Sequence, residues 1–118
     1  IPEDPQHHFL TWLTVREIQR EHLFIGGNRA LPDFVPIIVK FYQPEGVMDK
    51  KQRQLLSELT DKAIRDSLGE AAANVLISCI MLDVPDGQWG ANGDVWDLPQ
   101  ITQLAGFQHL SHLVESEA

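Results

Sequence analysis

Residues 34–42 read Phe34-Val35-Pro36-Ile37-Ile38-Val39-Lys40-Phe41-Tyr42, a run that is almost continuously apolar and rich in β-branched side chains. Such a run predicts a strand that is buried on both faces, as a central parallel strand would be. Pro36 has no amide hydrogen to donate, so it should lie at the opening of the strand or on an edge. The run ends at Gln43-Pro44-Glu45-Gly46, a sequence typical of a turn.

The segment that follows, residues 49–68, has the periodicity of an amphipathic helix. Asp49 with Gln52 three residues later resembles a capping box, and Gly69 is a natural residue to end the helix. The apolar stripe expected to face the core consists of Leu55, Leu56, Leu59, Ala63, Ile64 and Leu68. Charged side chains occupy the remaining face and should lie in solvent.

A second long apolar stretch, residues 74–84, predicts another buried strand. Strand, helix and strand in this order form a β-α-β unit, and a right-handed crossover would make the two strands parallel. Residues 9–15 alternate between two faces and are rich in aromatic and β-branched side chains, which predicts a further strand. The expected fold class is therefore α+β, with one mixed sheet that carries a helix on one face.

The composition limits the classes of function. The chain has 118 residues, 43% of them hydrophobic, which fits one globular domain. A formal net charge of −8 argues against nucleic acid or an anionic membrane as a partner bound through bulk charge. No apolar stretch approaches the length of a membrane span, and the single cysteine cannot form an internal disulfide. A cytoplasmic protein is the expectation.

Two patterns could hold a phosphate or a metal ion, and both have simpler interpretations. Gly87, Gly90 and Gly93 follow a strand, but their spacing differs from a dinucleotide fingerprint and Trp89 would crowd a pyrophosphate. A structural turn is the more natural interpretation. His109 and His112 lack the spacing and the accompanying glutamate of a zinc motif. Exposed histidines are expected, and neither a metal nor a cofactor is predicted.

Two other patterns could supply catalytic groups. Asp83, Asp86, Asp94 and Asp97 crowd one end of the last strand, where a pair could do acid–base work if burial separated their proton affinities. A solvated acidic rim is the simpler interpretation. Cys79 lies in apolar surroundings, where thiols are usually inert. Trp89 is flanked by glycines at the end of a buried strand, where it could wall a small pocket or cap the core.

The order of these motifs resembles the β-α-β unit of the tautomerase superfamily, whose parent is oxalocrotonate tautomerase. The resemblance rests on residues 36–41, Glu45-Gly46, residues 51–69, residues 83–85 and residues 88–93. Residues 9–27 resemble the second half of a first unit in the fused two-unit members, such as the chloroacrylate dehalogenase and malonate semialdehyde decarboxylase groups. The implied organisation is a single domain: the remainder of a first unit (residues 1–33), a complete second unit (34–96) and a C-terminal tail (97–118).

The resemblance implies that catalysis would use an amino-terminal proline, whose secondary amine serves as general base or acid. Pro36 occupies the equivalent place in the second unit, but its nitrogen is an amide without a basic lone pair. Pro2 follows Ile1 and fails for the same reason. The catalytic proline is therefore expected to be absent from this chain and to belong to a segment upstream of it.

Substrate-binding residues are also implied by the resemblance. Trp89 matches the aromatic wall of the family's pocket, whereas Val47 and Ser78 stand where the family's substrate-binding arginines are expected. Lys40, Arg29 and Arg16 are the cations that could substitute for those arginines. The implied substrate is a small carboxylate or keto acid, and the implied assembly is a homo-oligomer, with a trimer as the usual form.

Two functions remain open from the sequence. The first is a keto–enol isomerase, or a related dehalogenase or decarboxylase, acting on a small 2-keto or three-carbon acid. The second is a non-catalytic relative of the family that serves as an oligomeric or binding protein, which the missing arginines favour.

Overall fold

The computed structural model describes residues 6, 11–30, 33–106 and 108–115 of the chain. The strands are β1 (Phe24–Ile25), β2 (Asn28–Arg29), β3 (Val35–Pro44), β4 (Val75–Val84), β5 (Trp89–Ala91) and β6 (Asp94–Trp96). The helices are α1 (Lys50–Leu68), α2 (Leu98–Ala105) and α3 (Ser111–Glu115), with short 3-10 turns at Arg20–His22, Gly69–Asn74 and Gln108–Leu110. The chain therefore has the α+β class that the sequence predicts.

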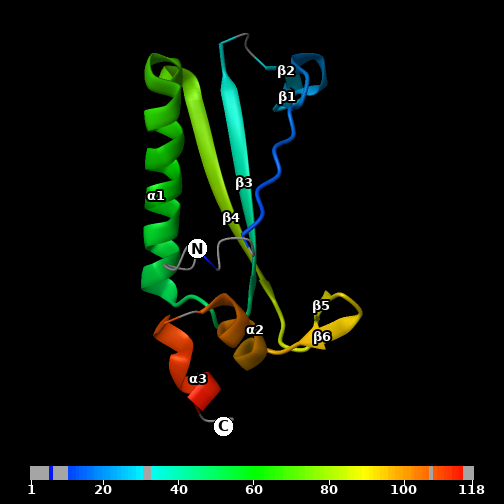
Figure 1. The fold of residues 1–118 in the computed structure, drawn as a ribbon. Helices are drawn as coiled ribbons and strands as arrows, with labels where there is room; N and C mark the ends of the chain where they lie inside the picture. The colour runs from blue at the N-terminus through cyan, green and yellow to red at the C-terminus, as the bar shows by residue number, and fades with distance from the viewer. Residues whose placement is uncertain (1–5, 7–10, 31–32, 107, 116–118) are drawn as a thin grey trace.

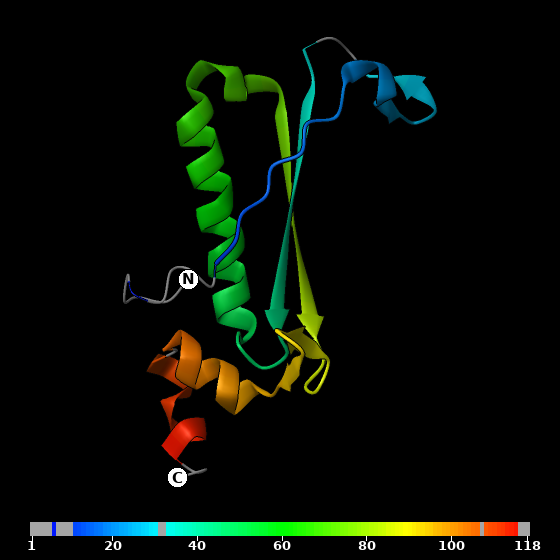
Figure 2. The ribbon, with the colours of Figure 1, turned by 45° about the vertical axis from the view of Figure 1, so that its right-hand side comes forward.

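The central feature is the β3–α1–β4 unit (Figures 1 and 2). β3 and β4 run parallel and stay in register over their full length, from Val35 opposite Val75 to Pro44 opposite Val84. The amide of Glu45 continues the ladder by donating to the carbonyl of Val84 at 2.8 Å. The predicted order of strand, helix and parallel strand is confirmed, and Pro36 lies on a strand with one partner, as a residue without an amide hydrogen requires.

The ends of α1 lie where the sequence places them. The side chain of Asp49 accepts from the amide of Gln52, and the side chain of Gln52 accepts from the amide of Asp49, which completes the predicted capping box. At the other end the amide of Gly69 donates to the carbonyl of Arg65. Both ends of the helix therefore satisfy backbone groups that would otherwise lack partners.

Replacing Asp49 by alanine should lower the free energy of unfolding by about 1 kcal/mol, because an N-cap side chain satisfies an orphan amide of the first turn. Chemical denaturation monitored by circular dichroism measures this change. Asp49→Asn is the matched control, since asparagine caps almost as well as aspartate. Equal losses in both variants would contradict a role for this cap.

The two faces of the β3–β4 sheet differ in exposure. Odd-numbered residues such as Val39, Phe41 and Cys79 are half-buried on the side of α1, and Gln43 and Val75 are buried. Several even-numbered residues of the other face stay exposed in the single chain, and we call these residues the bare face: Ile38, Lys40, Tyr42, Leu76, Ile80 and Leu82. The prediction that residues 34–42 are buried on both faces is wrong for the single chain, because no described element covers that side.

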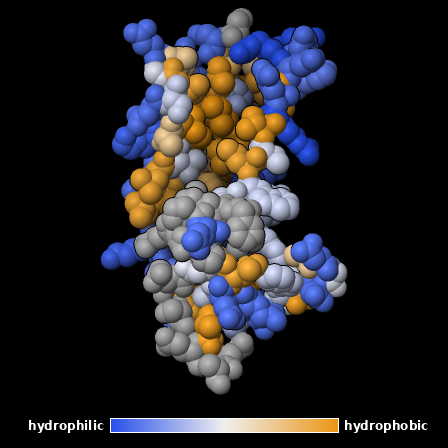
Figure 3. Space-filling model, in the orientation of Figure 1, coloured by the Kyte–Doolittle hydropathy of each residue, from blue (hydrophilic) through white to orange (hydrophobic). Residues whose placement is uncertain are grey.

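The inward stripe of α1 differs from the predicted one. Leu56 and Ile64 are half-buried, but Leu55 and Leu59 are exposed to 52% and 53%. The helix is therefore rotated so that the line through Leu56, Thr60 and Ile64 faces the sheet. Hydrophobic residues gather on the upper half of the face drawn in Figure 3, over the long strands. The two-stranded sheet is too narrow to cover the whole apolar stripe of the helix.

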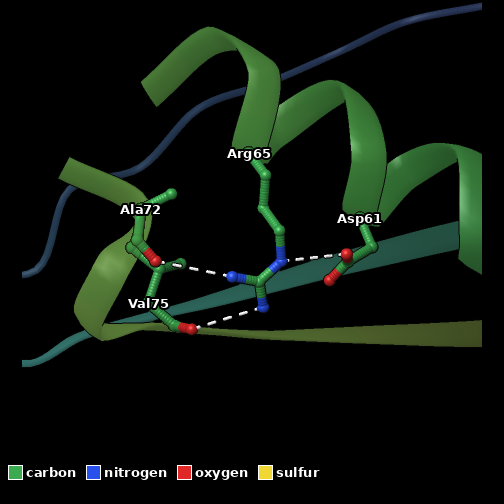
Figure 4. A network of polar contacts seen from close by, with 4 residues as sticks. All are labelled: Asp61, Arg65, Ala72 and Val75. Carbon is green, nitrogen blue, oxygen red and sulfur yellow. Dashed lines mark hydrogen bonds and ion pairs between the residues drawn. The ribbon is translucent and has the colours of Figure 1, made fainter. Parts of the chain in front are cut away.

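Arg65 connects the end of α1 to the start of β4 (Figure 4). Its guanidinium donates to the carboxylate of Asp61 at 2.9 Å and to the backbone carbonyls of Ala72 and Val75 at 3.4 Å each. The planar guanidinium can serve several acceptors at once because its donors diverge. This contact holds the Gly69–Asn74 turn against the helix and so directs the chain into β4.

The C-terminal helices pack on the loop that joins β3 to α1. The position that a Cβ atom would take on Gly46 lies 3.0 Å from the side chain of Leu98 at the start of α2. The imidazole Nε2 of His109 lies 2.6 Å from the carbonyl oxygen of Val47. Thr102 and Ala105 of α2 are each only 2% exposed. The best-buried part of the described chain therefore lies at the C-terminal ends of the parallel strands.

Two predictions about the sheet are wrong. The described residues form three separate two-stranded sheets, β1–β2, β3–β4 and β5–β6, instead of one mixed sheet. Residues 11–15 carry no strand, while Phe9 and Leu10 lie outside the described residues. Alternation gives a segment the side chains of a strand, but a strand also needs a neighbour to pair with.

Candidate functional site

The candidate site lies beyond the carboxyl ends of the parallel strands, where ligands commonly bind in open sheets with helical crossovers. The chain leaves β4 through a turn in which the amide of Gln88 donates to the carbonyl of Pro85 at 3.0 Å, and it then forms the β5–β6 hairpin. Asn92 and Gly93 make the tight turn with φ of 52° and 86°. Trp89 lies opposite Trp96 in this hairpin, so two indoles share one small sheet.

A hollow of about 630 Å³ lies between β6 and α2 and is open to solvent. Its lining residues are Asp94, Val95, Trp96, Gln100, Gln103 and Leu104. This lining includes an indole and two amides but no cation, and Asp94 would repel an anion. The hollow therefore fits a neutral or cationic polar group better than a carboxylate.

Three of the four clustered aspartates have structural partners. The carboxylate of Asp86 accepts from the amide of Leu98 at 2.9 Å, and Asp97 caps α2 by accepting from the amide of Gln100 at 2.9 Å. Asp83 accepts from the side-chain amide of Gln43 at 2.7 Å. Asp94 lines the hollow. These contacts give the acidic cluster a role in holding the start of α2 and the ends of the strands.

Gln43 and Thr102 are the buried polar side chains among the described residues. Gln43 is 8% exposed, and although its Nε2 donates to Asp83, its Oε1 has no hydrogen-bond partner. Thr102 is 2% exposed, and its Oγ1 also lacks a partner. Buried polar atoms without partners are costly. Each of these two atoms is therefore a local cost to the stability of the fold.

The residues predicted to bind substrate lie on different elements. Lys40 is exposed near the middle of β3 on the bare face, and Pro36 lies near the start of the same strand. Trp89 is half-buried in β5. Arg29 ends β2, where its guanidinium lies 5.9 Å from the ring centre of Phe24. Arg16 is exposed in the segment before the first 3-10 turn.

The single chain does not bring these residues together. β2, which contains Arg29, lies near the start of β3, whereas β5, which contains Trp89, lies beyond the end of β4, so the two elements are at opposite ends of the β3–β4 sheet in both ribbon views (Figures 1 and 2). Strands of ten residues span about 30 Å. Pro36 and Lys40 lie on the same side of β3, but three residues separate them along the strand. The assignment of Trp89, Lys40, Arg29 and Arg16 to substrate binding stays a prediction.

One ion pair outside this region, between Lys62 and Asp66, lies on the surface of α1. The hydrogen bond that Lys62 donates to Asp66, together with the charge of that carboxylate, raises the pKa of Lys62 on the solvent side of α1. No cluster of three metal-binding side chains occurs within the described part of the chain. His7 and His8 lie outside the described residues. Among the helices that the structure describes, none combines the length and apolarity needed to cross a membrane.

Sequence reasoning missed the pairing of Gln43 with Asp83 and the buried position of Thr102. The pairing depends on the register of two strands that are 40 residues apart, which no local pattern records. The hairpin did have a local signal, because Asn-Gly between two tryptophans favours a tight turn. Searches of protein-family models, curated proteins and solved structures found no match to this chain.

Proposed function

We propose that this chain is the β-α-β part of a tautomerase-like protein that moves a proton on a small 2-keto or three-carbon acid. One observation supports the proposal most: two long parallel strands joined by a single helix are followed directly by a hairpin that carries Trp89. This is the order of elements expected from the resemblance. The parallel sheet places Trp89 at its carboxyl end, where a small substrate could lie against the indole.

The proposed chemistry needs a general base that removes a proton from the carbon beside the carbonyl, and a cation that stabilises the enolate oxygen. Lys40 is the cation of the bare face, and its exposed ammonium can reach a carboxylate. The nitrogen of Pro36 is an amide within β3 and cannot act as the base. The proposal therefore assigns the base to a proline amine outside these 118 residues, in an assembled protein.

The extent of the exposed surface supports assembly from several copies. The chain exposes 9306 Å², whereas a compact protein of its mass exposes about 6,500 Å². Its radius of gyration is 17.8 Å, against about 13.5 Å for a compact domain of this length. Parallel sheets are nearly always covered on both faces. We propose a homo-oligomer, with a trimer as the first expectation, in which neighbouring copies cover the surface that one copy leaves open.

Replacing Lys40 by alanine in the active assembly should lower kcat/KM for an enolisable 2-keto acid at least about tenfold, which corresponds to roughly 1.4 kcal/mol of transition-state stabilisation. The ultraviolet absorbance of the enol follows the reaction. Lys40→Arg should retain most of the activity, and Lys51→Ala on the exposed surface of α1 is the matched control. Equal rates for Lys40→Ala and the parent protein would remove Lys40 from the site.

The base is tested separately, through the proline whose amine the proposal assigns to it. Changing that proline to alanine should abolish most of the activity, because alanine provides a primary amine with different basicity and geometry. Unchanged rates would contradict the proposed proton transfer. This result is independent of the Lys40 variants, so each part of the proposal can fail alone.

A non-catalytic binding protein is the second candidate, and the positions of the cations favour it. Arg29 stacks over Phe24, and Lys40 and Trp89 lie on separate elements in the single chain. Titration of the assembled protein with a small keto acid, followed by tryptophan fluorescence, separates the two candidates. Saturable quenching supports a keto-acid site and with it the enzyme, whereas no saturable change supports a non-catalytic protein whose ligand is not a keto acid.

A further inference from the structure

Two apolar surfaces of this chain are exposed to solvent, and neither packs against the other. The first is the segment before the first 3-10 turn, residues 11–19, which we call the arm; its Leu13 and Val15 are 81% and 85% exposed. The second is the β4 half of the bare face, where Leu76, Ile80 and Leu82 are exposed to 54%, 40% and 38%. Large aliphatic side chains that stay in water forgo the free energy of burial. Both surfaces therefore favour a partner.

The arm and the β4 half of the bare face match in length and in period. Nine extended residues span about 30 Å, and so does a strand of ten residues such as β4. Leu13 and Val15 are two residues apart, as are Ile80 and Leu82, so both pairs repeat with the period of an extended chain. The side chains of one can therefore lie between those of the other.

Charge favours this surface as a place where two copies meet. Each copy carries a formal net charge of −8, so copies repel one another across most of their surfaces. The β4 half of the bare face consists of Leu76, Ile80 and Leu82 and has no charged side chain. A second copy can approach this surface without placing a carboxylate against a carboxylate.

We propose that the arm of one copy packs along the β4 half of the bare face of a second copy. The proposal rests on the assembly suggested under the proposed function and specifies one of its contacts. A second copy is the occupant because a single copy leaves both surfaces exposed, and because the accessible area in excess of a compact monomer is large enough for an obligate interface.

A cross-linking experiment with two single-cysteine chains tests this contact between copies. In a Cys79→Ser background, a Val15→Cys chain is mixed with an Ile80→Cys chain, unfolded, refolded together and oxidised. A mixed disulfide dimer is expected, since these two chains can join only between copies. Pairing Val15→Cys with Leu59→Cys, on the exposed side of α1, is the matched control and should give much less dimer. Equal yields from both mixtures would overturn the proposal.

Measuring the mass of the assembly in solution tests the arm contact separately from the existence of the assembly. Leu76→Lys, on the bare face, and Leu13→Lys with Val15→Lys, on the arm, should both reduce the mass to that of one chain. Leu59→Lys is the control, because Leu59 and Leu76 are exposed to 53% and 54%. If Leu76→Lys dissociates the assembly and the arm variant does not, the arm contact is refuted while the assembly stands. A parent chain that is already monomeric refutes both.

Discussion

Replacing Gly46 by alanine should destabilise the chain by about 2 kcal/mol, the largest effect expected for adding one methyl group. Gly46 has a φ of +89°, a conformation that costs an alanine about 1–2 kcal/mol. The added Cβ would also lie 3.0 Å from the side chain of Leu98. Leu98 must then shift, which loosens the contact between α2 and the β3–α1 loop. Chemical denaturation measures the loss.

Gly87→Ala is the matched control for this prediction. Gly87 has nearly the same backbone conformation, with a φ of +84°, but nothing lies within 4 Å of its added Cβ. The free energy of unfolding of Gly87→Ala should fall only by the backbone contribution, about 1 kcal/mol. The excess loss in Gly46→Ala measures the packing of α2 on the loop, and equal losses would show that this packing adds no stability.

Replacing Asp83 by alanine should cost about 1–3 kcal/mol, because the buried amide of Gln43 would lose its acceptor. The hydrogen bond between them is 2.7 Å long, and Gln43 is 8% exposed. Asp83→Asn should cost less, since its carbonyl oxygen can still accept. Equilibrium denaturation of both variants provides the comparison.

A double variant isolates the interaction from the loss of either side chain. Gln43→Leu with Asp83→Ala removes the donor and the acceptor together, so no buried amide is left without a partner. The double variant should lose less free energy of unfolding than the sum of the losses in Gln43→Leu and Asp83→Ala alone. Strict additivity would mean that the contact between Gln43 and Asp83 contributes nothing.

The β-α-β unit could be predicted from sequence because its signals are local. The run at residues 34–42, the capping box at Asp49 and the second apolar run at residues 74–84 each identify one element, and the handedness of crossovers makes the strands parallel. The structure places β3, α1 and β4 within a few residues of those limits. Each of these elements is determined by residues within itself.

The features that were not predicted depend on residues far apart in the chain. Leu55 and Leu59 belong to the apolar stripe of α1, but their exposure depends on how wide a sheet lies beneath the helix. Thr14 and Val15 have the alternation of a strand, but a strand forms only where it pairs with another strand, which local alternation does not determine. The partner of Gln43 depends on strand register. The predicted substrate residues lie on several elements, so no local pattern could determine whether they meet.

The central claim is that this chain is a β-α-β unit whose open surface is covered only in an assembly of copies. Sedimentation equilibrium of the purified chain over a range of micromolar concentrations tests this claim most directly. The account predicts a mass that is a whole multiple of 13.3 kDa, with a trimer as the first expectation. A mass of one chain at all concentrations, together with cooperative unfolding of that monomer, would contradict it.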